Sequence, residues 1–82
     1  MDRRKLSRIY RLGQELITLE SRLESAHYRL LTAQRELDRG DLTCREWSRA
    51  AHEYGVAYGS HRALEQRLRI VRGRFHFEVK DV

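Results

Sequence analysis

Residues 36–47 read Glu36-Leu37-Asp38-Arg39-Gly40-Asp41-Leu42-Thr43-Cys44-Arg45-Glu46-Trp47, and they combine a signal that ends a helix with one that begins another. Gly40 can adopt the left-handed conformation that closes a helix C-terminus without a steric penalty. Thr43 and Glu46 have the spacing of a capping box, and Leu42 and Trp47 have that of a hydrophobic staple. Together these signals predict a chain reversal, with its turn at residues 40–43.

On both sides of this turn, apolar residues repeat at alternating spacings of three and four, which is typical of a coiled-coil seam. Before the turn, the seam comprises Ile9, Leu12, Leu16, Leu19, Leu23, Ala26, Leu30, Ala33, Leu37 and Gly40. After the turn, it comprises Trp47, Ala50, Tyr54, Ala57, His61, Leu64, Leu68, Val71 and Phe75. The pattern predicts helices at about 3–39 and 44–72, ended by Gly73. The fold class is therefore all-α, an antiparallel two-helix hairpin over residues 1–73.

Folding the chain at this turn pairs residues whose numbers sum to 83 or 84. The layers next to the turn are then Leu37 with Trp47, Ala33 with Ala50, Leu30 with Tyr54 and Ala26 with Ala57. Small layers between bulky ones would let the two backbones approach closely. A parallel coiled-coil dimer is the alternative, but the alanine layers form only when the second helix runs back along the first.

The hydrophobic pattern changes to a period of two in Arg74-Phe75-His76-Phe77-Glu78-Val79-Lys80-Asp81-Val82. This alternation predicts an extended tail at residues 74–82, with Phe75, Phe77 and Val79 on one side. Such a strand would need the sheet edge of a partner or of a second copy. A chain end that folds onto the helices is the alternative.

A second stripe at the same alternating spacing lies beside the seam of the first helix. Its ends are apolar, with Leu6, Tyr10, Ile17 and Leu31, and its middle is polar, with Glu20, Glu24 and His27. A hairpin of 82 residues buries a small core, because each helix covers only one stripe of the other. We therefore expect a homodimer that buries Leu6, Tyr10, Ile17 and Leu31 in a four-helix bundle. Isolated apolar residues on solvated helices are the alternative.

Composition limits the setting in which the chain works. No apolar run approaches the length of a membrane span, and the start of the chain lacks the hydrophobic segment of a signal peptide. The chain has one cysteine, Cys44, which excludes a disulfide within the chain. We expect a soluble cytoplasmic protein that does not bind a membrane.

Charge is unevenly distributed along the folded chain. The net charge is +5, but residues 1–19 and 62–82, which meet at the end away from the turn, carry 11 basic and 5 acidic residues, or +6. The candidate residues for binding a partner protein or nucleic acid at this end are Arg3, Arg4, Arg8, Arg11, Arg69, Arg72, Arg74, Phe75 and Phe77. Arginine pairs with phosphate or carboxylate groups, and aromatic rings stack on exposed bases. The alternative is a solvated end whose arginines pair with Glu15 and Glu65.

One pattern is typical of metal-binding bundles. Glu24 and His27 form a Glu-x-x-His element, with Glu20 one turn earlier, as in ferritin-like bundles that hold two iron or manganese ions. Such a site needs further carboxylates from facing helices, and neither Glu53 nor Glu65 lies on the seam. A polar gap in the stripe explains the same residues, so we expect no metal and no cofactor.

No phosphate-binding loop, catalytic triad or paired-carboxylate cleft is present in the sequence, so we expect no enzyme activity. The first hypothesis is a non-catalytic protein-interaction module, of the kind that bacteria or phages encode as inhibitors or regulators. The second is RNA or DNA binding by the basic end, and the third is a di-metal bundle.

Overall fold

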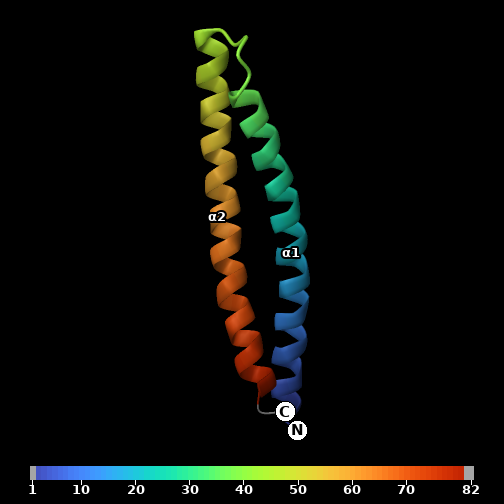
Figure 1. Cartoon of the computed structure of the whole chain (residues 1–82). Coiled ribbons are helices and arrows are strands. Elements are labelled where there is room, and N and C mark those ends of the chain that lie inside the picture. The colour runs from blue at the N-terminus through green and yellow to red at the C-terminus, as the bar shows by residue number, and fades with distance from the viewer. Residues whose placement is uncertain (1, 81–82) are drawn as a thin grey trace.

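The computed structural model of the chain describes residues 2–80. It consists of helix α1 (Arg3–Leu37) and helix α2 (Cys44–Lys80), which run antiparallel and side by side (Figure 1). The hairpin measures 62 × 15 × 14 Å. The start of α1 and the end of α2 lie together, opposite the turn (Figure 1), and we call this the open end. The predicted all-α hairpin is confirmed.

The two helices meet along the predicted seam. The seam positions of α1 from Ile9 to Leu37 are buried or half-buried, and so are those of α2 from Ala50 to Phe75. The largest buried cluster lies toward the open end and consists of Leu19, Leu68 and Val71, packed against Leu12, Leu16, Leu23 and Leu64. Val71 is 0% exposed. The alternating spacing therefore predicted correctly which side of each helix faces its neighbour.

The register of the two helices differs from the predicted one. A Cβ added to Gly13 would lie 3.7 Å from Phe75 Cε2, and the rings of His27 and His61 lie 5.8 Å apart. The residue numbers sum to 88 in both pairs, not to 83 or 84, so the pairing is shifted by about one helical turn.

This shift replaces the expected alanine layers. Continued toward the turn, the observed register places Leu30 level with Ala57 and Ala33 level with Tyr54. Near the turn, large side chains therefore lie level with small ones, whereas in the main cluster Leu19 lies level with Leu68. The predicted pairing of alanine with alanine is wrong.

Both helix starts are capped by side chains. The backbone N–H of Arg4 donates to Asp2 Oδ1 at 3.1 Å, so Asp2 is the N-cap of α1. The backbone N–H of Glu46 donates to Thr43 Oγ1 at 3.2 Å, and the Thr43 hydroxyl donates to Glu46 Oε1 at 2.9 Å. These bonds satisfy an N–H group that the first turn of a helix leaves unpaired. The predicted start of α2 is confirmed.

The end of α1 differs from the prediction. The helix stops at Leu37, and the N–H of Asp38 donates to the Gln34 carbonyl at 3.0 Å. Over residues 2–80, no glycine has a positive φ, so the expected left-handed Gly40 is wrong. The loop spans residues 38–43, not 40–43, and α2 begins beyond the end of α1 (Figure 1). No residue of α1 therefore lies level with Trp47. Its side chain is 52% exposed, contrary to its expected place on the seam.

The second helix is longer than predicted. It passes through Gly73 and ends at Lys80, so the expected extended tail at 74–82 is wrong for residues 74–80, while residues 81–82 lie outside the described part. A glycine inside a helix costs only about 1 kcal/mol. Contacts with α1 favour the longer helix, because Phe75 packs near Gly13 and the Glu78 carboxylate lies 3.3 Å from Arg8 Nε.

Candidate interaction surfaces

A groove with an apolar floor lies between the two helices at the open end. It has a volume of about 690 Å³ and is lined by Arg8, Arg11, Leu12 and Glu15 of α1 and by Ile70, Gly73, Arg74, Phe77 and Glu78 of α2. Ile70 and Phe77 lie seven residues apart and so share one side of α2. Gly73 lies between them, and its missing side chain leaves the floor open. We call this surface the open-end groove.

Arginines surround the floor of the open-end groove. Arg8 pairs with Glu78 at 3.3 Å, whereas Arg11 and Arg74 form no ion pair with any residue in 2–80. Nearby, the guanidinium of Arg67 donates to Glu15 Oε1 from Nε at 3.0 Å and from Nη2 at 2.7 Å. The expected pairing of an arginine with Glu15 is therefore present, and the rim of the groove still keeps an excess of positive charge.

The structure brings together some of the residues predicted to bind a partner and separates others. Arg8, Arg11, Arg74 and Phe77 line the open-end groove. Phe75 is half-buried on the seam. Arg72 belongs to a different face of the hairpin, where its Nη2 lies 3.9 Å from Glu20 Oε1.

Three other predicted residues, Arg3, Arg4 and Arg69, are exposed and do not line the groove. The floor residues Leu12, Ile70 and Gly73 were missed as a site. Reading the sequence at a seven-residue spacing from Phe77 would have found Ile70.

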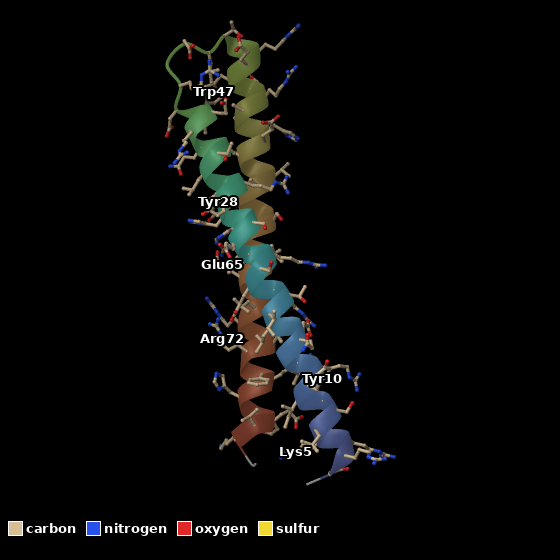
Figure 2. All side chains as sticks on the ribbon, turned by 90° about the vertical axis from the view of Figure 1, so that its right-hand side faces the viewer. Lys5, Tyr10, Tyr28, Trp47, Glu65 and Arg72 are labelled. Carbon is tan, nitrogen blue, oxygen red and sulfur yellow. The ribbon has the colours of Figure 1, made fainter. Side chains whose placement is uncertain are left out.

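The predicted dimer stripe is uncovered in the single chain. Tyr10 is 68% exposed and Ile17 is 63% exposed, and Leu6 and Leu31 are also exposed. Figure 2 shows Tyr10 on α1 in the half of the hairpin toward the open end. These side chains are available to a partner, and the dimer stays a prediction.

Histidines and glutamates gather at a shallow hollow on the same side of α1 as this stripe. Its lining includes Glu20, Glu24 and His27 of α1 together with His61, Glu65 and Arg72 of α2. His61 Nδ1 lies 2.9 Å from Glu65 Oε1, so the half-buried seam histidine has a carboxylate within ion-pair distance. Within residues 2–80, no three or more His, Cys, Asp or Glu side chains are arranged to hold a metal ion.

The loop between the helices contains a local charge cluster. Arg39 donates to both carboxylate oxygens of Asp41, from Nε at 3.2 Å and from Nη2 at 3.1 Å, and from Nη1 to Glu36 Oε2 at 3.1 Å. The hydrogen bonds from Arg39 lower the pKa of the Asp41 carboxyl. The same hydrogen bonds raise the pKa of Arg39, and the bond to Asp41 contributes more to this increase than the bond to Glu36. This cluster ties residues of the loop to the last turn of α1.

Comparison with protein-family models, with curated proteins and with solved structures finds no match to this chain. Across residues 2–80, neither helix is long and apolar enough to cross a membrane.

Proposed function

We propose that this protein is a non-catalytic binding protein that holds a partner protein in the open-end groove. The observation that carries the proposal is the combination of an apolar floor, formed by Leu12, Ile70 and Phe77, with the arginine rim around it. Exposed apolar side chains at regular helical spacing are typical of protein interfaces, in which arginine is also enriched.

The groove suggests the chemistry of its partner. Large apolar side chains, flanked by aspartate or glutamate, would fill the floor and pair with Arg11 and Arg74, which have no carboxylate partner within residues 2–80. An amphipathic helix supplies both features from one stripe, and it can lie along a groove between two helices. We therefore propose an acidic amphipathic helix as the partner segment.

The test uses a photo-crosslinking amino acid, benzoylphenylalanine, placed at position 77 in the full chain and, as a control, at position 56. Val56 is a suitable control because it lies on the same side of α2, three heptads from Phe77, and outside the open-end groove. We expect protein adducts from the host lysate at position 77 and few at position 56. Replacing Arg11 and Arg74 by glutamate should then reduce the adducts at position 77. Equal adducts at both positions would contradict the proposal.

Nucleic-acid binding is a second candidate, favoured by the exposed Arg3, Arg4 and Arg69 beside the rim of the groove. None of these three forms an ion pair with another residue in 2–80. Such arginines could contact successive phosphates, and the affinity would then fall steeply with added salt, with a log–log slope of about −0.7 per phosphate contact for a single strand.

Two variants separate the two candidates. Phe77→Ala removes part of the apolar floor and should abolish binding of an amphipathic helix, while phosphate binding should fall only slightly. The double variant Arg3→Ala with Arg4→Ala should weaken nucleic-acid binding and its salt dependence, and leave helix binding largely intact. A mobility-shift titration with single-stranded RNA at two salt concentrations measures the second effect.

Self-association is a further part of the proposal, because the stripe formed by Leu6, Tyr10, Ile17 and Leu31 stays exposed in the single chain. The chain exposes 6676 Å², whereas a compact monomer of 9.8 kDa exposes about 5,200 Å². The surplus of about 1,500 Å² exceeds the roughly 800 Å² that each partner buries in a standard interface. We propose a homodimer, to be tested by sedimentation equilibrium.

A further inference from the structure

We propose that two copies of this chain pair face to face in antiparallel orientation, with residues 3–19 of α1 in each copy against residues 18–34 of α1 in the other. This inference rests on the homodimer proposed above and specifies its interface and its direction. The exposed stripe of each copy is thus covered by the second copy of the same chain.

The pairing face contains one stripe from each helix. The shallow hollow places Glu20, Glu24 and His27 of α1 next to Glu65 and Arg72 of α2, so these residues belong to one face. On α1, the spacing of three and four continues from them to Leu6, Tyr10, Ile17 and Leu31.

On α2, steps of seven residues add Tyr58 and Val79 to Glu65 and Arg72. Figure 2 shows Glu65 and Arg72 toward the same side of α2. Apolar side chains therefore stand at both ends of each stripe, and on α2 the charged side chains Glu65 and Arg72 stand between them.

The face becomes complementary to itself when one copy is reversed. On α1, reversal about the midpoint between residues 18 and 19 places Leu6 opposite Leu31 of the second copy, Tyr10 opposite His27 and Ile17 opposite Glu20. On α2, the stripe of one copy meets the stripe of the second copy by reversal about the midpoint between residues 68 and 69.

That second reversal places Glu65 opposite Arg72 of the second copy and Tyr58 opposite Val79. The contact between Glu65 and Arg72 occurs twice in a symmetric dimer. Apolar ends meet apolar ends, and each carboxylate in the middle of α2 meets a guanidinium.

The two midpoints lie at the same height in the hairpin. The numbers of residues that contact across the two helices sum to 88 in the pair Gly13 and Phe75 and in the pair His27 and His61. The midpoints of the two stripes sum to 87, within one residue of this value. One twofold axis across the hairpin therefore matches both stripes at once, as a closed dimer with a single interface requires.

Charge decides between this arrangement and a parallel one. In a parallel dimer the two open ends, each carrying +6, would lie side by side. In the antiparallel dimer the basic residues 3–19 of α1, with a net +4, lie against residues 18–34 of the other copy's α1, whose net charge is 0. Like charges placed together oppose association, so the antiparallel direction is favoured.

The first experiment measures direction through Cys44, an exposed cysteine near the turn. A spin label on Cys44 of the dimer should report a distance between labels of about 75 Å, from 1.5 Å per residue along α2 on both sides of the proposed axis. A distance below about 30 Å would overturn the antiparallel arrangement but would still agree with a homodimer. A monomeric mass in sedimentation equilibrium would overturn both.

The second experiment tests the register by charge exchange. Glu65→Arg alone and Arg72→Glu alone should each raise the dimer dissociation constant by about tenfold, because each places like charges opposite one another. The double variant should restore the original value. Glu53→Arg changes an exposed charge outside the proposed face and serves as the control. Failure of the double variant to recover, with each single variant folded by circular dichroism, would overturn the register.

Discussion

The two halves of the hairpin are held together by different side chains. Toward the open end, Leu19, Leu68 and Val71 are buried among further leucines, and the ion pairs of Glu15 with Arg67 and of Arg8 with Glu78 join the helices. Toward the turn, the buried side chains are alanines, namely Ala26, Ala50 and Ala57.

A fully buried leucine contributes about 1.5–3 kcal/mol, and an alanine contributes far less because it removes little apolar area from water. The open half therefore supplies most of the stability. We expect the half toward the turn to depend more on its caps and its loop, so that one continuous heptad pattern carries two levels of stability.

The largest expected effect tests this difference directly. Leu68→Ala should lower the free energy of unfolding by about 3 kcal/mol, through lost burial and a cavity in the main cluster. Ala57→Gly, at a buried position of the turn half, should cost only about 1 kcal/mol, the difference in helix propensity. Urea denaturation at one protein concentration measures both. Equal losses would mean that the two halves contribute equally.

A second prediction concerns the register in the turn half. Ala57→Leu should cost about 2 kcal/mol by overpacking, because Leu30 is level with it. The double variant Ala57→Leu with Leu30→Ala should lose about 1–2 kcal/mol less free energy of unfolding than the sum of the two single variants, since residues in contact do not act independently.

Leu23→Ala is the control for this pair, because Leu23 lies about two turns from that layer and should show no coupling to Ala57→Leu. Coupling to Leu23 in place of Leu30 would contradict the register.

A third prediction concerns the start of α2. Thr43→Ala removes the acceptor for the N–H of Glu46 and should lower stability by about 1 kcal/mol. Thr32→Ala is the matched control, because the Thr32 hydroxyl donates only to the Tyr28 carbonyl of its own helix. The melting temperatures of the two variants would be compared, and an equal decrease would argue against a role for the cap.

The smallest expected effect depends on pH and lies in the loop. Because hydrogen bonds from Arg39 lower the pKa of Asp41, the folded state binds this proton more weakly than the unfolded state. The contribution of the pair is therefore present above the ordinary aspartate pKa and is lost as the pH falls through the lowered pKa. A carboxyl titration followed by NMR should show the Asp41 pKa returning toward its usual value in Arg39→Ala. An unchanged titration would exclude the pair as the cause.

Much of the fold could be predicted because helix periodicity and capping are local properties. The spacing of three and four identified the seam from Ile9 to Leu37, and Thr43 with Glu46 marked the start of α2. The end of α2 could not be predicted in the same way. The alternation around Phe77 is compatible with a strand, and only the contacts of Phe75 and Glu78 with α1 favour a helix.

The candidate site was predicted in part for a similar reason. Charge counts located the basic end and named Arg8, Arg11, Arg74 and Phe77, because net charge depends on composition and on the chain reversal alone. The apolar floor could not be named, since Leu12 and Ile70 line one groove only through the register between the two helices.

The sequence by itself determined that this chain is an antiparallel helical hairpin, which side of each helix is buried, and which end is basic. Those properties follow from periodicity and from chain connectivity. Only the tertiary structure decided the register, the length of the loop and the course of residues 74–80. These depend on how a six-residue loop sets one helix against the other, and on which of several similar packings fits the side chains of the two seams together.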